Sequence, residues 1–234
     1  MWIKRELRFM KVLTLDVGNT SVDACQYDGK NLTFIRKFSH KEVEHLKGDY
    51  DMVYVASVKP SLNTTLKEVF PNAVFIESKD VPIKATFDTN SVGIDRLLNL
   101  YGAWRFYSKN SLVISCGTAF VLDVLVEGVF EGGFISLGLA TKLQCLSQRA
   151  ELIPSFELKK VEVFLGKDTQ SAVVGGILKE AKSFIKVFLE ELKNTYMRDF
   201  SVVITGGDGW LFEDIGIYDP LLMHKAMLHV HKLL

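Results

Sequence analysis

Short apolar runs alternate with polar turns along the chain, and their lengths and spacing predict a mixed α/β protein. Three closely spaced apolar runs come first, and Tyr27-Asp-Gly-Lys-Asn31 between the second and third is typical of a hairpin turn. The first half is expected to contain strands at 11–15, 22–27, 32–38, 52–57 and 73–76, and helices at 41–46 and 62–70. Antiparallel strands followed by alternating helix and strand are typical of a mixed α/β domain.

The second half repeats this order of elements. A helix expected at 93–107 leads into strands at 112–114, 119–126, 129–135 and 202–204, with helices at 141–149, 171–196 and 220–231. The repeat lies in the pattern and not in residue identity, so it indicates a weak internal duplication. We therefore predict an α/β fold of two similar domains, residues 1–108 and 109–234, each with a mixed sheet of the five-stranded type flanked by helices.

Polar residues suited to phosphate follow the first strand. The apolar run ends in Asp16, and Gly18, Asn19 and Thr20 come next. A carboxylate can hold hydrated Mg2+, a glycine lets the backbone approach an anion, and amide and hydroxyl groups donate hydrogen bonds to phosphate oxygens. The segment is equally compatible with an ordinary hairpin turn, in which Gly-Asn is common.

Two further strands end in glycine turns of the same kind. Cys116-Gly-Thr118 joins two apolar strands, with Asp123 on the second, and Thr205-Gly-Gly-Asp-Gly209 follows a third. Three such turns can converge on one nucleotide if two similar halves face each other, and this favours the phosphate interpretation of the first turn.

Composition limits the classes of partner. The chain is 48% hydrophobic and 24% charged, with 28 basic and 28 acidic side chains. The balanced charge argues against nucleic acid as the main partner. The apolar runs are too short to span a membrane, and the charged first ten residues do not have the apolar core of a signal peptide.

The cysteines and histidines show no metal-binding pattern. Three cysteines without metal spacing favour a reducing, cytoplasmic compartment. Cys116 lies in a glycine turn, where either a reactive thiol or a small buried residue is expected, and the buried residue is the commoner case. The five histidines are scattered, and we interpret them as surface or packing residues.

Four segments occur in a particular order over most of the chain. They are Asp16-Val-Gly-Asn-Thr20, Gly93-Ile-Asp-Arg96, Gly117-Thr-Ala119 with Asp123 and Gly132-Gly133, and Thr205-Gly-Gly207. Together they resemble the type III pantothenate kinases, of the actin and sugar-kinase superfamily. The resemblance implies two ribonuclease-H-like (actin-like ATPase) domains and a homodimer. It also implies that pantothenate is phosphorylated by ATP, the first step of coenzyme A synthesis, with Mg2+ and a monovalent cation, K+ or NH4+.

The resemblance also assigns roles to individual residues. Asp95 would be the general base that takes the proton from the pantothenate hydroxyl, and Arg96 would bind the pantothenate carboxylate, where a guanidinium fork suits a planar anion. Asp16 would serve the metal and the phosphates. The other implied contacts are Gly18, Asn19, Thr20, Gly117, Thr118 and Ala119 with phosphate, Gly206 and Gly207 with adenosine, Gly93 and Phe87 with pantothenate, Thr169 with pantothenate from the partner subunit, and Ser115 and Asp123 with cations. Taken without the other motifs, Gly-Ile-Asp-Arg is also typical of a helix start with a surface salt bridge.

The chain departs from the family pattern in the second phosphate segment and before the Gly93 motif. Ser115 stands in place of an aspartate that lies by the cations, and Val121 in place of a threonine. A hydroxyl ligates a cation without charge, so the monovalent site is in doubt. Phe87 stands in place of a tyrosine, a loss of one hydrogen bond worth roughly 0.5–1.5 kcal/mol.

Two functions remain open on the sequence. The first is an active pantothenate kinase with an altered cation site. The second is a non-catalytic nucleotide- or pantothenate-binding regulatory relative on the same fold. The kinase is favoured because Asp16, Asp95, Arg96 and Asp123 are all present, and a chain without catalysis would have little need of them.

Overall fold

The computed structural model describes residues 10–234. Residues 1–10, which were judged above not to be a signal peptide, lie outside the described residues except for Met10. The chain forms two compact units that interleave along the sequence. Unit 1 combines residues up to 82 with 90–98 and 223–234, and unit 2 combines 83–89 with 99–222. The expected domain boundary between residues 108 and 109 stays a prediction.

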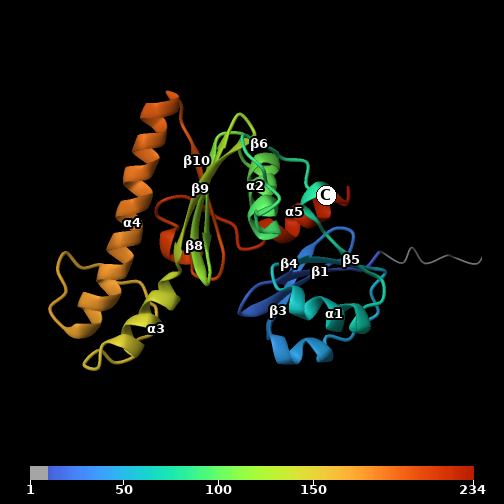
Figure 1. The fold of residues 1–234 in the computed structure, drawn as a ribbon, viewed down its shortest axis with the longest axis horizontal. Helices are drawn as coiled ribbons and strands as arrows, with labels where there is room; N and C mark the ends of the chain where they lie inside the picture. Colours follow the sequence, from blue (N-terminus) through green and yellow to red (C-terminus); the bar gives the residue numbers. More distant parts are fainter. Residues whose placement is uncertain (1–9) are drawn as a thin grey trace, which may run out of the picture. The chain divides into compact units, whose positions relative to one another are not determined.

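Unit 1 is built on a five-stranded sheet with the order β3-β2-β1-β4-β5. Its strands are β1 (Val12–Val17), β2 (Ser21–Tyr27), β3 (Leu32–Ser39), β4 (Met52–Ser57) and β5 (Ala73–Phe75). β2 runs antiparallel to β1 and β3, whereas β4 runs parallel to β1 and β5. The helix α1 (Asn63–Val69) lies against one face (Figure 1). Leu13, Leu15 and Val17 belong to the core cluster with Leu66 of α1, so the alternating Thr14 and Asp16 face the other side.

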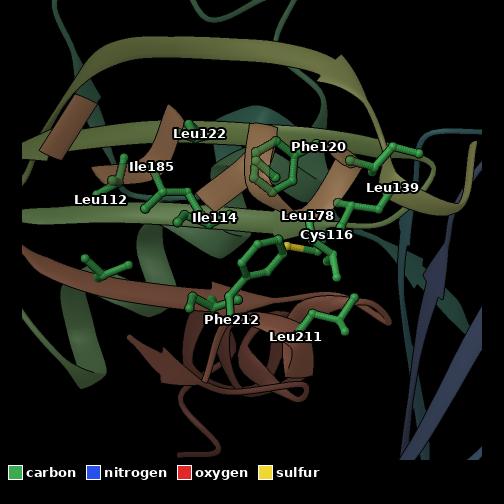
Figure 2. Packing of buried hydrophobic residues seen from close by; sticks show 14 of the residues in the cluster. Leu112, Ile114, Cys116, Phe120, Leu122, Leu139, Leu178, Ile185, Leu211 and Phe212 are labelled. Carbon is green, nitrogen blue, oxygen red and sulfur yellow. The ribbon is translucent and has the colours of Figure 1, made fainter. Parts of the chain in front are cut away.

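Unit 2 repeats this topology in a six-stranded sheet with the order β11-β10-β7-β8-β9-β6. Its strands are β6 (Lys84–Ala85), β7 (Ser111–Cys116), β8 (Ala119–Val126), β9 (Val129–Leu137), β10 (Ser201–Thr205) and β11 (Ile217–Tyr218). β7, β8 and β9 are antiparallel neighbours, and β10 and β11 continue the sheet in parallel with β7. Leu112, Ile114 and Cys116 of β7 pack in one buried cluster with residues of α3 (Leu139–Arg149) and α4 (Thr169–Tyr196) (Figure 2).

The shared strand order identifies both units as ribonuclease-H-like, and the prediction of two similar α/β domains is confirmed. The sequence did not predict the two edge strands β6 and β11, each of two residues. β6 makes the second sheet six-stranded, where a five-stranded type was expected. The helix expected at 41–46 is a 3-10 helix, His40–His45.

Two helices contribute to both units. α2 (Ile94–Phe106) has residues 94–98 in unit 1 and the rest in unit 2, and α5 (Leu222–Val230) begins in unit 2 and continues in unit 1. α2 places Asp95 in its first turn. Within the part of the chain that is described, no helix combines the length and apolarity that crossing a membrane requires.

Candidate active site

Asp16 lies near the end of β1, on the sheet face opposite α1. The strand register sets it directly across from Asp23 of β2 and next to Ala56 of β4. Burial and the carboxylates of Asp23 and Asp95 raise the pKa of Asp16 to about 8, and Lys37 partly offsets them. An acid held this way is costly to ionise alone, and a bound cation would relieve the cost. This environment fits a hard divalent cation.

The turn after β1 is fixed by its backbone. The Gly18 N–H donates to the Ser21 carbonyl oxygen at 3.0 Å, and the Val58 N–H donates to the Val17 carbonyl oxygen at 3.0 Å. His40 Nε2 lies 3.0 Å from the Gly18 carbonyl oxygen. The side chains of Asn19 and Thr20 are exposed beyond this held turn. The turn therefore presents a hydroxyl and an amide on a rigid base, as phosphate binding needs.

Asp95 and Arg96 form the start of α2. The Asp95 carboxylate packs against Gly93, and a Cβ on Gly93 would overlap the Oδ1 atom of Asp95. Burial raises the pKa of Asp95, while the backbone N–H and the charge of Arg96 oppose the rise. Asp95 is close enough to Asp16 for its charge to raise the pKa of that acid. The first and second family motifs thus meet in unit 1, although 79 positions separate these two acids in the sequence (95 − 16).

A cavity of about 520 Å³ lies beside these residues. Its walls come from the carboxyl ends of β4 and β5, from α1, and from residues 90–94 immediately before Asp95. Ligands of open α/β sheets bind outside the carboxyl ends of strands. Val58 and Ile94 supply apolar wall, and Ser57 and Asn63 supply polar atoms. The Asn63 Oδ1 atom is buried with no hydrogen-bond partner among the described residues, so it is available to a ligand donor.

In unit 2 the turn between β7 and β8 is held by the start of α3. The Gly138 N–H and the Thr141 hydroxyl both donate to the Thr118 carbonyl oxygen at 2.9 Å. Gly138 approaches so closely that a Cβ there would overlap the Gly117 carbonyl oxygen. Gly117 and Thr118 are exposed at the tip of the turn. The Gly117 N–H donates to the Ala119 carbonyl oxygen at 3.0 Å, so the exposed tip of this loop is also fixed by its own backbone.

The third glycine turn packs directly on the second. Gly206 has φ +88, and a Cβ there would overlap backbone atoms of Cys116. The Asp208 N–H donates to the Cys116 carbonyl oxygen at 3.1 Å, and the Tyr218 hydroxyl donates to the Gly206 carbonyl oxygen at 3.2 Å. Two of the three predicted turns are thereby brought together in unit 2. Burial raises the pKa of the Cys116 thiol, which supports the packing interpretation of this cysteine.

Ser115 and Asp123 lie on one face of the unit 2 sheet. The register pairs Ser115 with Val121 and Val113 with Asp123, so Ser115 and Asp123 are diagonal neighbours. Thr205 of β10 lies beside Ser115 on its other side. Asp123 is buried, with 3% of its surface exposed. Two hydroxyls and one carboxylate therefore share this face of the unit.

Phe87 and Thr169 also belong to unit 2. The Phe87 ring packs on Phe130 with centroids 5.0 Å apart, and it is 43% exposed. Thr169 is exposed as the first residue of α4, after the N-cap Asp168.

Sequence reasoning missed several supporting residues. His40 and Tyr218 hold the Gly18 and Gly206 carbonyl groups, and Asp23 acts on Asp16. No motif marks His40 or Tyr218, because each acts through a backbone atom distant in sequence. Asp23 could have been found from the strand pattern, since a hairpin places it opposite Asp16.

Comparisons with known proteins place these features in context. A family model described as type III pantothenate kinase matches residues 12–191. A type III pantothenate kinase of Aquifex aeolicus is 43% identical over 221 residues, covering 93% of this chain and 96% of that protein. Another, of Thermosipho melanesiensis, is 30% identical over 245 residues, covering 95% and 98%.

The fold comparison agrees with the topology. A solved structure from Campylobacter jejuni, described as a Baf family transcriptional activator, matches with a TM-score of 0.69 at 22% identity. It covers 94% of this chain and 97% of its own. At this identity the similarity shows the fold alone.

Proposed function

The chain belongs to the type III pantothenate kinase family, and from this premise we propose that it transfers the γ-phosphoryl group of ATP to the hydroxyl group of pantothenate. The proposal rests on one observation above all. Asp16, fitted for a cation, and Asp95, fitted as a base, lie within electrostatic reach of each other in unit 1. Phosphoryl transfer needs these two functions close together, because catalysis is mainly positioning and charge neutralisation.

Asp95 is the general base of this proposal. Its carboxylate accepts the hydroxyl proton of pantothenate as the hydroxyl oxygen forms a bond to the γ-phosphorus and the bond from that phosphorus to the β,γ-bridging oxygen breaks, releasing ADP. Burial raises the pKa of Asp95, which makes its carboxylate a stronger base than a free one. The neighbouring Arg96 opposes the rise and so favours the ionised form that can accept a proton.

Asp16 is the proposed ligand for Mg2+. When bound, the metal neutralises charge on the transferred phosphoryl group. Mg2+ at such sites is held by one or two carboxylates, waters and substrate phosphates, and not by a cage of protein ligands.

The substrates are assigned to the two sets of residues described above. For ATP, we propose phosphate contacts from Gly18, Asn19 and Thr20 and from Gly117, Thr118 and Ala119, with Gly206 and Gly207 next to the adenosine. For pantothenate, we propose Gly93, Arg96 and Phe87, with Thr169 contributed by a partner subunit. The cavity before Asp95 lies where a hydroxyl-bearing substrate could reach the base, and its volume of about 520 Å³ falls in the ordinary range for small ligands.

A monovalent cation and a homodimer complete the proposal. Ser115 and Asp123 share a face with Thr205, so hydroxyl oxygens could ligate K+ or NH4+ beside a single carboxylate. For the dimer, unit 2 exposes apolar side chains of β9, namely Phe134, Ile135 and Leu137, each more than half exposed. Apolar surface of this kind is typical of protein interfaces.

The test is ATP-dependent phosphorylation of pantothenate by the purified protein with Mg2+, with and without K+ or NH4+. Asp95→Asn should reduce kcat by about 10²-fold to 10⁴-fold, with circular dichroism unchanged. Glu68→Gln, an exposed acid of α1 in the same unit, is the matched control and should retain activity. Full activity of Asp95→Asn would overturn the base assignment. A folded wild-type protein that binds ATP but never turns over would favour the non-catalytic regulatory relative.

A further inference from the structure

We propose that His40 is a positioning residue for the phosphates of ATP: its ring holds the Gly18 carbonyl group, and the backbone N–H of Asn19 is thereby aimed at a phosphate oxygen. This inference rests on the proposed function, because it concerns the turn after β1 to which phosphate is assigned. His40 lies 22 positions from Gly18 in the sequence, outside every segment that carries the family resemblance. It touches neither substrate and acts through Gly18.

The hydrogen bond between His40 and the turn has one possible direction. His40 Nε2 lies 3.0 Å from the Gly18 carbonyl oxygen. A carbonyl oxygen only accepts hydrogen bonds, so Nε2 carries a hydrogen and donates it. A substitution that removes this donor therefore leaves the Gly18 carbonyl group without the contact that holds it.

His40 controls a peptide group that the other bonds of the turn do not reach. The Val58 N–H donates to the Val17 carbonyl oxygen, and the Gly18 N–H donates to the Ser21 carbonyl oxygen, both at 3.0 Å. These two bonds hold the same peptide group, the one between Val17 and Gly18. Among the described residues, the next peptide is held at its carbonyl oxygen by His40. Gly18 joins the two peptides, and the backbone of a glycine rotates more freely than that of any other residue.

The direction of the Asn19 N–H follows from the position of the Gly18 carbonyl group. The peptide between Gly18 and Asn19 is trans, and in a planar trans peptide the carbonyl group and the N–H point in opposite directions. The Asn19 N–H is therefore turned away from His40. Asn19 is exposed, and within the described part of the chain its N–H has no recorded acceptor. A free N–H in a fixed direction on an exposed turn is a donor for an anion.

His40 is itself held in place by the segment that carries it. The strand register sets Ser39, at the end of β3, across from Ser21, where the turn returns to the sheet. His40 follows directly and begins a 3-10 helix. The Ser39 N–H donates to the Glu42 carboxylate at 2.8 Å, and Val43 lies fully buried in the unit 1 core. Because the segment is already ordered, the ring loses little further freedom on binding Gly18.

Two amide substitutions separate the hydrogen bond from the packing of the ring. The amide nitrogen of glutamine is as many bonds from the backbone as Nε2, whereas the amide nitrogen of asparagine matches Nδ1. His40→Gln should therefore keep KM for ATP close to wild type. His40→Asn and His40→Ala should raise KM for ATP by about 3-fold to 10-fold, the effect of one hydrogen bond, with KM for pantothenate unchanged. His45→Ala, at the exposed end of the same helix, is the matched control and should behave as wild type.

The first experiment is an NMR titration that does not depend on turnover. Inorganic tripolyphosphate with Mg2+ should shift the Asn19 amide resonance of the nitrogen-15-labelled wild type, whereas adenosine, which has no phosphate, should not. His40→Gln and His45→Ala should show the same shift at the same concentrations. His40→Asn should need a several-fold higher concentration of tripolyphosphate. An Asn19 resonance that does not respond to tripolyphosphate in the wild type would overturn the proposal.

Steady-state kinetics on the same variants supply the second measurement. A wild type that turns over, with equal KM for ATP in His40→Gln and His40→Asn, would refute the positioning role and leave the kinase intact. A shift of the Asn19 resonance that depends on His40, in a protein without turnover, would refute the kinase and leave the positioning role. The comparison of glutamine with asparagine still decides the matter if circular dichroism shows that His40→Ala does not fold.

Discussion

Replacing Asp16 by asparagine should stabilise the protein without ligands while abolishing its activity. The two side chains have nearly the same shape, and asparagine carries no charge. Asp16 is partly buried, faces Asp23 across the strand pair and lies within reach of Asp95. Like charges directly opposite in an antiparallel pair destabilise a sheet. At pH 7 the substitution removes the cost of protonating this acid on folding, a cost that burial and the neighbouring carboxylates cause, but it also removes the proposed metal ligand.

The size of the effect follows from the pKa of Asp16, which rises from 3.8 to about 8 on folding. At pH 7 the unfolded chain has this acid ionised, whereas the folded chain keeps it mostly protonated. The difference destabilises the fold by at most about 4 kcal/mol at pH 7. Because Asp16 keeps some exposure to solvent, the measured gain in Asp16→Asn should be smaller than this limit. The penalty is absent below pH 3.8, grows up to pH 8 and is constant above it.

The assay is urea unfolding of wild type and Asp16→Asn without nucleotide or Mg2+, at several pH values from 5 to 8. The variant should be more stable at pH 7, and its advantage should grow with pH over this range. Asp28→Asn is the control, because hydrogen bonds from the backbone N–H groups of Lys30 and Asn31 lower the pKa of Asp28. That variant should not gain stability. An Asp16→Asn protein equal to or weaker than wild type at pH 7, or an advantage independent of pH, would refute the reasoning.

Three further predictions concern other parts of the structure. Burial lowers the pKa of His224 to about 4. Wild type should therefore lose about 2 kcal/mol of stability between pH 7 and pH 5, because the unfolded chain takes up a proton that the folded chain does not. Urea unfolding should show a smaller loss of stability in His224→Gln, and an equal loss would contradict this prediction. Gly138→Ala would push a methyl group into the Gly117 carbonyl group, and it should raise KM for ATP by about 10-fold or more. Steady-state kinetics measure this change, and an unchanged KM would refute the role of this contact. Ser115→Asp adds a carboxylate diagonal to Asp123 and should increase the stimulation of turnover by K+; no change in K+ dependence would argue against a cation at this face.

Much of the fold could be predicted because most strands are long apolar runs. The strand expected at 119–126 and the one at 52–57 have the predicted bounds, as β8 and β4. β6 and β11 could not be predicted, since a two-residue strand has no periodicity and exists only through its pairing partner. α3 begins at Leu139, two residues before the expected start at 141, with Gly138 as its N-cap packed on the turn between β7 and β8.

Candidate site residues could be proposed from the sequence wherever one short segment carries the chemistry, and their roles stay predictions. The Asp16, Gly93 and Gly117 motifs each combine an acid or a hydroxyl with a glycine, and the family resemblance, rather than residue type alone, assigned their roles. The supporting contacts were not predictable, because His40 and Tyr218 act on backbone carbonyl groups that only the folded chain brings near.

The repeated topology explains why Ser115 is the informative departure in this chain. Asp16 and Ser115 occupy the same place in their sheets: each is the last but one residue of its strand and comes two positions before a glycine. Across the hairpin, Asp16 faces Asp23, whereas Ser115 faces Val121. At this position unit 1 therefore has two facing carboxylates that repel each other, whereas unit 2 has a hydroxyl and a valine. A bound cation would offset such repulsion, so the requirement for a cation should be stronger at Asp16 than at Ser115.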